Sequence, residues 1–557
     1  MEENKIQNNK ATVRTPIIVG TTLALGILIG ATFFGGKRAT GAGDVSRSTT
    51  KFREILSYIN RSYVDSVNTD SLVDYSITKM LEKLDPHTYY FPPQDAQLAR
   101  SQLESGFDGI GIEFNVFNDT VYVVTPLAGG PSEAVGIQSG DAIIKANNNS
   151  LTGKDASSTN IFANLRGKRG SEAKLEIKRK GFKDLLKFSV IRDKIPQYSI
   201  DAAYIMDDHK TGYLKINRFT ETTYDEFKEH MAALQKQGMK QLLLDLRGNP
   251  GGYMDRATDI VDEMVGGKGV IVYTDGKDTR NNRKAFAHIN GMFEKGAVVV
   301  LVDEGSASAS EIVSGSLQDY DRALIVGRRT FGKGLVQQPI QLSDGSELRL
   351  TISRYYIPSG RSIQKPYVKG SLDSYEHELD DRGKSGEYFI ADSIKNNPKM
   401  RFKTMGGRTV YGGGGITPDI FVPRDTSHIT AYLMELYGRN VIREYAMSYA
   451  NDNRKTLLKQ SFESYLKDFK VSDAMLSNMN RTLENTGVKY SAKDFADSKE
   501  FVKLQLKAAI ARHVWQRSVK NGLNNEYYQI VYADDPMVAT AIKSFAKAEK
   551  LEKEKKL

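Results

Sequence analysis

Apolar residues recur with two different periods along this chain, and each period predicts a different kind of element. From 48 to 104 they return every three to four residues, as at Phe52 and Ile55, which predicts amphipathic helices. From 105 to 192 short runs alternate between apolar and polar residues and are bounded by turn residues, which predicts strands. From 425 to 557 the helical period returns. The pattern therefore predicts an α+β protein of several domains.

Between 193 and 424 short buried strands alternate with helices. The continuous apolar runs at 241–246 and 297–302 are typical of strands that are covered on both faces. A helix is predicted after each run, one from Asp255 and one from Glu311. Because a strand, a turn and a helix in that order form a βα unit, this region is predicted to be a mixed α/β domain.

The second of these βα turns carries residues that could perform chemistry. Ser308 lies where the strand gives way to the helix, beside helical N–H groups with partial positive charge. Lys333 lies on a separate loop between Gly332 and Gly334. A serine hydroxyl needs a base to take its proton, and a lysine amine can be that base when burial lowers its pKa. Ser308 and Lys333 are therefore a candidate nucleophile and base.

Two other interpretations of these residues stay open on the local sequence. Ser308 and Glu311 have the S-x-x-E spacing of a capping box, which needs no catalysis. Residues 327–333 match G-x-x-x-x-G-K, the start of a phosphate-binding loop. However, Gly334 stands where such a loop has Ser or Thr, and a strand-like run follows instead of a helix.

The stretch 305–338 resembles the core of the carboxyl-terminal processing peptidases, also called tail-specific proteases. It contains GSASASEI, then QD, then TFGKG and VQQ, in the family's order. The resemblance implies that Ser308 is the nucleophile, that Lys333 is the general base and that Gln337 orients the lysine. It also implies a serine endopeptidase that acts through an acyl-enzyme on protein or peptide substrates with free C-termini.

The glycine turn DLRGNPGG, residues 245–252, resembles a second part of that family's site. A turn between strand and helix leaves backbone N–H groups exposed. The family match implies that the N–H of Gly251 or Gly252 joins that of Ala309 in an oxyanion hole, which stabilises charge on the attacked carbonyl. From the local sequence a tight turn alone is an alternative interpretation, and the choice between the two glycines stays open.

Residues 105–192 resemble a PDZ module, in which backbone N–H groups hold a peptide carboxylate while the peptide adds a strand to the sheet. Residues 136–141 match the module's G-[LI]-x-x-G-D turn. The candidate carboxylate-binding loop consists of Gly109, Ile110, Gly111 and Ile112. The resemblance therefore implies recognition of substrate tails.

The N-terminal residues predict a membrane anchor. Thr15 to Phe34 contain no charge and are long enough to span a bilayer as a helix. They follow the polar residues 1–14 and precede Lys37 and Arg38. We expect an uncleaved signal anchor, with the bulk of the chain exported to the periplasmic or another extracytoplasmic side; a long signal peptide is the alternative.

Composition restricts the function further. The chain has 557 residues, of which 40% are hydrophobic and 26% charged, as in a globular protein. Its net charge of +10 is dispersed and no nucleic-acid module is recognisable, so we expect no nucleic-acid partner. The absence of cysteine excludes disulfides and thiol catalysis. The seven histidines lack metal-ligand spacing, and we expect neither a metal nor another cofactor.

The remaining segments are expected to be structural. Core packing explains the helices of 48–104, although the family resemblance extends over LEKLDPHT and makes a homodimer through this region a reasonable inference. The helical residues 425–557 are expected to form a packed appendage without chemistry. Two other functions stay open: a non-catalytic PDZ scaffold that binds protein C-termini, and a nucleotide-driven machine built on the 327–333 loop.

The predicted fold class is thus α+β and multidomain. The expected parts are a polar tail (1–14), a transmembrane signal anchor (15–34), a helical region (48–104), a PDZ β-sandwich-like domain (105–192), a mixed α/β serine protease domain (193–424) and a helical C-terminal extension (425–557).

Overall fold

A computed structural model describes residues 45–554, apart from 102–103, 105, 118, 128, 289, 486 and 516–521. The expected membrane anchor at 15–34 lies outside the described residues. None of the helices in the described part is long and apolar enough to cross a bilayer. The chain divides into two compact units, Met1–Ser76 and Ile77–Leu557.

The described part of the first unit is helical. α2 (Val45–Ser62) is the amphipathic helix that the apolar period predicted, and α3 (Thr69–Leu81) follows it. No residue of α2 is buried, and Phe52 and Ile55 are 42% and 50% exposed. The expectation that these apolar positions pack into a core is therefore wrong for α2.

The segment that precedes the PDZ-like sheet is not wholly helical, which corrects the prediction for 48–104. The strand β1 (Tyr89–Phe91) pairs antiparallel with β18 (Glu347–Tyr356). Helix α4 (Pro93–Ser101) then begins at a proline, which is tolerated in the first helical turn because its missing N–H has no partner there. A strand of three residues is too short to show a period, so the sequence pattern could not reveal it.

The expected PDZ region forms an antiparallel sheet in the order β3-β4-β5-β7-β8, with β6 on β5. Its strands are β3 (Ile112–Phe117), β4 (Thr120–Pro126), β5 (Ala142–Ala146), β6 (Asn149–Ser150), β7 (Glu172–Lys178) and β8 (Leu186–Ile191). Its helices are α5 (Pro131–Ala134), η1 (Gly153–Asp155) and α6 (Ser158–Leu165), and β2 (Gly106–Gly109) pairs with β9 (Asp193–Pro196) beside it. Within the described residues β3 pairs only with β4, so its other edge is available to an added strand.

A six-stranded sheet carries the two βα turns that the sequence singled out. Its order is β10 (Ile200–Ile205), β11 (Thr211–Ile216), β12 (Gln241–Asp245), β15 (Val298–Val302), β16 (Leu324–Gly327) and β21 (Ile420–Phe421). β10 runs antiparallel to β11, and all the other neighbours are parallel. β12 and β15 are buried on both faces, which explains their continuous apolar runs.

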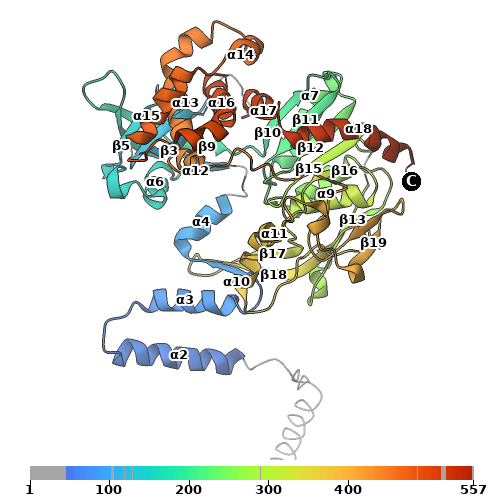
Figure 1. The fold of residues 1–557 in the computed structure, drawn as a ribbon. Coiled ribbons are helices and arrows are strands. Elements are labelled where there is room, and N and C mark those ends of the chain that lie inside the picture. Colours follow the sequence, from blue (N-terminus) through green and yellow to red (C-terminus); the bar gives the residue numbers. More distant parts are fainter. Residues whose placement is uncertain are drawn as a thin grey trace, which may run out of the picture. The chain divides into compact units, whose positions relative to one another are not determined.

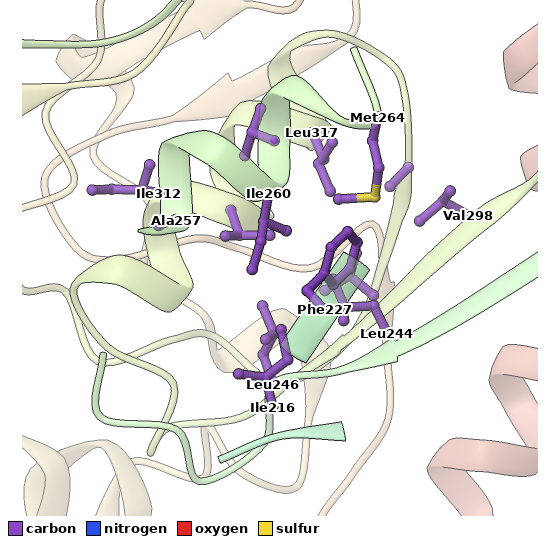
Figure 2. Close-up of a cluster of buried hydrophobic side chains, with 14 of the residues drawn as sticks. Ile216, Phe227, Leu244, Leu246, Ala257, Ile260, Met264, Val298, Ile312 and Leu317 are labelled. Atoms are coloured by element: carbon purple, nitrogen blue, oxygen red, sulfur yellow. The ribbon is translucent and has the colours of Figure 1, made fainter. Parts of the chain in front are cut away.

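Three helices cover one face of this sheet: α7 (Thr223–Lys236), α8 (Met254–Asp262) and α9 (Ala309–Asp319). Figure 2 shows Ile260 of α8 and Leu317 of α9 turned towards the strand residues of the same apolar cluster. Phe227 of α7 completes the layer and is fully buried. This core fixes the helix starts, and therefore the turns that precede them, relative to the strands.

The last helix, α18 (Pro536–Glu554), covers the opposite face of the same sheet (Figure 1). Its residues Met537, Ala541 and Phe545 are buried together with Val299 and Leu324 of the strands. Part of the expected C-terminal extension therefore completes the α/β domain. The apolar period of a helix reveals its buried face but not the element that covers this face.

A second sheet has the order β1-β18-β13-β14 with β17 on β18, and only β17 and β18 follow the turn of Ser308 in the chain. Its other strands are β13 (Val270–Asp275), β14 (Lys284–Phe286) and β17 (Leu335–Gln341), and β19 (Arg401–Lys403) pairs with β20 (Thr409–Tyr411) nearby in sequence. The connecting segments contain η2 (Thr279–Asn281), α10 (Leu372–Glu376), α11 (Glu378–Lys384), η3 (Ala391–Ser393) and η4 (Pro398–Met400).

The C-terminal helices before α18 have a hydrophobic core of their own. They are α12 (Ala431–Gly438), α13 (Val441–Leu457), α14 (Phe462–Asp468), α15 (Asp473–Glu484), α16 (Ala492–Trp515) and α17 (Asn525–Val531). Arg512 of α16 forms an ion pair with Glu113 of β3 at 2.9 Å. The prediction of a helical C-terminal region is confirmed. Through this ion pair the region contacts the PDZ-like sheet.

Candidate active site

The two βα turns lie side by side because their strands are parallel neighbours. β12 and β15 pair with Asp245 opposite Leu301, so both turns leave the same edge of the sheet. A Cβ atom placed on Gly251 would lie 2.7 Å from the Cβ of Ser308 and 2.9 Å from the N of Ala309. The glycine turn therefore touches the serine turn, and only a residue without a side chain fits there.

Ser308 has a strained backbone, with φ 54° and ψ −113° just before α9. An N-cap residue usually has an extended backbone and a side chain that accepts a helical N–H, but the Ser308 hydroxyl makes no such bond. A conformation this rare costs about 1–3 kcal/mol and is found mostly at functional sites. The capping box that the S-x-x-E spacing indicated is present in part, since the Glu311 side chain accepts the N–H of Ser308. A cap alone leaves the strained backbone unexplained, whereas a nucleophile on a sharp strand-to-helix turn would require such a backbone.

Glu311 joins the two candidate catalytic residues through their backbones. Its Oε2 accepts the N–H of Ser308 at 2.8 Å and the N–H of Lys333 at 2.9 Å. Its Oε1 accepts the N–H of Gly332 at 2.8 Å and the hydroxyl of Thr330 at 2.5 Å. Burial raises the pKa of Glu311 to about 7, although these hydrogen bonds oppose the rise.

Tyr355 forms a second link between the same two residues. Its buried hydroxyl donates to the carbonyl of Lys333 at 2.6 Å and to that of Ser308 at 3.0 Å. Ser308 and Lys333 are therefore held together by a carboxylate on their N–H groups and by a phenol on their carbonyls. Neither Glu311 nor Tyr355 had been assigned this role from the sequence, and Tyr355 lies outside the recognised motif.

The surroundings of Lys333 favour a neutral amine. Burial lowers the pKa of Lys333 below its ordinary value, and the guanidinium of Arg349 lowers it further, while Glu311 and Asp85 act in the opposite direction. No ion pair of the Lys333 Nζ occurs with any of the described residues. In this structure the Nζ is also not hydrogen-bonded to the Ser308 Oγ, although both residues are described. Catalytic hydrogen bonds often tighten only when substrate is bound.

Gln337, the residue expected to orient Lys333, lies half-buried on β17. Its side-chain nitrogen donates to the carbonyl of Leu335 at 3.4 Å. No hydrogen bond joins it to Lys333, so its expected role stays a prediction.

The glycine turn offers one free N–H to an oxyanion, and it is that of Gly252. The N–H of Gly251 donates to the Oδ1 of Asn249 at 2.9 Å and is therefore occupied. The N–H groups of Gly252 and Ala309 have no acceptor among the described residues. Asn249 also accepts the Ser310 hydroxyl on its carbonyl at 2.9 Å, which ties the glycine turn to the serine turn. The geometry thus favours Gly252 over Gly251 as the partner of Ala309.

The phosphate-binding interpretation of 327–333 does not agree with the structure. The segment runs from β16 to β17, so no helix follows Lys333 and no helix N-terminus faces a phosphate. The N–H groups of Gly332 and Lys333 already donate to Glu311. Among the described residues no group of three or more His, Cys, Asp or Glu could hold a metal ion.

The expected carboxylate-binding loop connects β2 to β3. Gly109 ends β2, Ile112 begins β3, and Gly111 between them has φ +72°, a value that favours glycine. Ile110 is buried and anchors the loop, since its carbonyl accepts both the N–H and the hydroxyl of Ser132. The loop therefore leads directly into the open edge strand, as peptide capture by strand addition requires.

A cavity of about 940 Å³ lies at the carboxyl ends of the parallel strands. Gly248 and Asp303 line it from the two βα turns, and Phe501 and Lys507 line it from α16. Clefts at this edge of a parallel sheet are the usual binding sites of α/β folds. The helical C-terminal region therefore contributes to a space beside the two βα turns, but neither Ser308 nor Lys333 lines it.

Comparisons with known proteins assign three parts of the chain. Residues 210–372 match Peptidase family S41, and residues 109–190 match the PDZ domain. Residues 432–516 match a family of unknown function, DUF8443.

Curated relatives that match about two thirds of the chain agree with this assignment. A carboxy-terminal-processing protease of Bartonella bacilliformis is 32% identical over 383 residues, which are 68% of this chain and 85% of that protein. The carboxy-terminal processing protease CtpB of Bacillus subtilis is 32% identical over 338 residues, which are 60% of this chain and 70% of that protein. Among solved structures, a photosystem II D1 C-terminal processing protease is 25% identical over 68% of this chain and 93% of its own, with a TM-score of 0.34. The chain therefore belongs to the carboxy-terminal processing proteases, the PDZ-containing serine peptidases of family S41.

Proposed function

We propose that this protease cleaves its substrates with a Ser308–Lys333 dyad. The observation that carries the proposal is the common anchoring of both residues: Glu311 holds their N–H groups on one oxygen, and Tyr355 holds their carbonyls. The strained backbone of Ser308 and the depressed pKa of Lys333 are what a nucleophile and a neutral base require. Gln337 would orient the lysine after a change of its side-chain conformation.

In the proposed reaction neutral Lys333 takes the proton of the Ser308 Oγ as this oxygen bonds to the carbonyl carbon of the scissile peptide. The electrons of the C=O bond move to its oxygen, which the N–H groups of Ala309 and Gly252 stabilise. The C–N bond then breaks, and protonated Lys333 gives its proton to the leaving amine. Water adds to the acyl-enzyme and loses a proton to Lys333, which returns it to the Ser308 Oγ as the acid product leaves.

We propose that the PDZ domain selects substrates by their free C-termini. The carboxylate would bind at the N–H groups of the loop formed by Gly109, Ile110, Gly111 and Ile112. The peptide tail would pair with the open edge of β3 as an added strand. The positive φ of Gly111 and the open edge of β3 support this assignment. Peptides of identical sequence with a free or an amidated C-terminus test it, since only the first carries the charge that the loop would bind.

The proposal is tested by comparing wild type with Ser308→Ala and Lys333→Ala on such peptides. Wild type should cleave the free-tailed peptide with a lower KM than the amidated one, and both variants should lose cleavage while their thermal unfolding remains cooperative. Labelling of Ser308 by a fluorophosphonate separates the alternatives. A protein that binds tails but is never acylated would instead be a non-catalytic PDZ scaffold.

We also propose that residues 15–34 anchor the enzyme in a membrane with its folded part on the extracytoplasmic side. The support is the uncharged length of this segment and the charged residues that flank it. Fractionation of cells that express the full chain tests this, because an anchored protein stays with the membranes after an alkaline wash. Recovery in the soluble fraction would contradict it.

A further inference from the structure

The loop that joins α3 to β1 contacts the hairpin β17–β18, which follows Lys333. β1 pairs with β18 through Tyr89 and Arg349, and the preceding residues Asp85 and His87 are buried. The sequence interpretation gave this LDPHT segment no role beyond packing and dimerisation. Its position next to the candidate base suggests a more specific one.

Asp85 accepts three hydrogen bonds through which it organises this contact. Its Oδ1 accepts the N–H of His87 at 2.8 Å and the hydroxyl of Thr351 at 2.9 Å. Its Oδ2 accepts the hydroxyl of Thr88 at 2.6 Å, and the Thr88 oxygen in turn accepts the N–H of Thr351 at 3.2 Å. Asp85 thus holds the side chain of Thr351 directly and the backbone N–H of Thr351 by way of Thr88.

Thr351 is the residue of β18 that lies opposite Gln337. The register of β17 and β18 shifts by a bulge between Val336 and Gln337, so this pairing is local and needs support. The hold of Asp85 on Thr351 supplies that support from the other side of β18. Asp85 therefore fixes the strand position beside the residue expected to orient Lys333.

The Asp85 carboxylate forms no ion pair with any described residue, and all its donors are neutral groups. The charged and titratable groups that act on Lys333 are Arg349 on β18, Glu311 on α9, and Asp85 and His87 on the loop before β1. His87 is neutral at working pH, because burial and Lys333 lower its pKa to about 3, and its Nε2 is hydrogen-bonded to the Tyr375 hydroxyl at 2.7 Å. Asp85 and Glu311 are therefore the two carboxyl groups whose charge raises the pKa of Lys333, and burial keeps part of Glu311 protonated near pH 7.

We propose that Asp85 is a positioning residue of the active site: it fixes the Thr351–Gln337 strand pair and stabilises the ammonium that Lys333 becomes when it has taken the serine proton. Glu311 is less suited to this second task, since its oxygens already accept four donors. The inference rests on the proposed dyad and extends it with a second carboxylate, contributed from more than two hundred residues earlier in the chain.

The test is the substitution Asp85→Asn, which keeps an oxygen for His87 and Thr351 but removes the charge. Without the anion, protonation of Lys333 becomes harder. We expect kcat to fall at least tenfold with KM within about twofold of wild type, and the acid limb of the kcat/KM profile to move to lower pH. The matched control is Asp344→Asn at the exposed turn of the same hairpin, which should change neither.

An acid limb that stays in place in folded Asp85→Asn protein overturns the proposal, whatever happens to kcat. A purely structural role would lower the melting temperature and kcat without moving the limb. If Asp85→Asn does not fold, Thr351→Val serves instead, because it keeps the charge but removes the hydrogen bond from the Thr351 side chain to Asp85. In this variant we expect kcat to fall severalfold, while KM and the acid limb of the pH profile of kcat/KM stay unchanged. A kcat equal to that of wild type would overturn the positioning role. Because wild type and Lys333→Ala are measured alongside, failure of the dyad itself is recognised separately.

Discussion

Ser308 and Lys333 donate their backbone N–H groups to the same atom, the Oε2 of Glu311, at 2.8 and 2.9 Å. Twenty-five residues separate them in the chain, and they belong to loops of two different sheets. A single carboxylate oxygen therefore sets the distance between the two backbones, whichever conformation the side chains adopt. The hydroxyl of Tyr355 donates to the carbonyls of the same two residues, so each backbone is held at both its N–H and its C=O.

Because the backbone of Ser308 is strained, we expect replacement by glycine to give a more stable protein than replacement by alanine. Its φ of 54° and ψ of −113° are the mirror image of a common conformation, which glycine adopts freely. Ser308→Gly should therefore unfold at a higher denaturant concentration than Ser308→Ala, by about 1 kcal/mol or more in free energy, since alanine retains the strain. Both variants should be inactive. Equal stability of the two, measured by urea unfolding, would mean that the turn is not strained.

A side chain at position 251 should disturb the proposed oxyanion hole by steric contact with the serine turn. An alanine Cβ there would lie 2.7 Å from the Ala307 carbonyl oxygen and from the Ser308 Cβ, so one turn must move away from the other. We expect Gly251→Ala to lower kcat about 100-fold, the size of effect seen when an oxyanion donor is lost. Gly248→Ala is the control, because Gly248 also has a positive φ but a Cβ there meets nothing within 4 Å. Similar losses in both variants would assign the effect to backbone strain.

The depressed pKa of Lys333 predicts how stability depends on pH. Between this pKa and the ordinary value of 10.5, the folded state binds fewer protons than the unfolded chain, so the free energy of unfolding rises with pH. Lys333→Met removes the ionisable group and should be more stable than wild type at pH 7, because burial in the folded state opposes the protonation that the unfolded chain allows. Its advantage should shrink as the pH approaches 10.5. Urea unfolding at several pH values measures this, with the exposed Lys399→Met as control.

Tyr355 predicts a loss of catalysis without a loss of binding. Tyr355→Phe keeps the ring but leaves the carbonyls of Ser308 and Lys333 without their shared donor. Loss of a buried hydrogen bond costs about 1–3 kcal/mol, and we expect kcat to fall about tenfold with little change in KM. Tyr356→Phe, whose ring stacks on Tyr273, is the matched control. Steady-state kinetics in which KM rather than kcat changes would place Tyr355 in substrate binding.

The two turns of the candidate site could be predicted from the sequence because each is local, whereas the roles of their residues were implied by the family resemblance. Continuous apolar runs identified β12 and β15, and the turns that follow them carry Gly252 and Ser308. The parts that could not be predicted depend on contacts between distant residues. Tyr355 donates to the carbonyl of Lys333, twenty-two residues earlier, and Asp85 accepts the hydroxyl of Thr351, 266 residues later. Neither a hydrophobic period nor a sequence motif indicates contacts between residues so far apart in the chain.

Two further features show the limits of pattern analysis. Gly251 and Gly252 are equivalent in sequence, and only the bond from the Gly251 N–H to Asn249 distinguishes them. The helical pattern of 425–557 predicted a packed appendage, but not that α18 at its end packs on the parallel sheet.

The most direct test of the dyad is the rate at which a fluorophosphonate acylates Ser308 in wild type and in Lys333→Met, measured across pH with the labelled residue identified by mass spectrometry. We expect labelling of wild type at Ser308 alone, with a rate that rises as Lys333 loses its proton below pH 10.5, and no labelling of Lys333→Met. Labelling of folded Lys333→Met at the wild-type rate would contradict the assignment of Lys333 as the base.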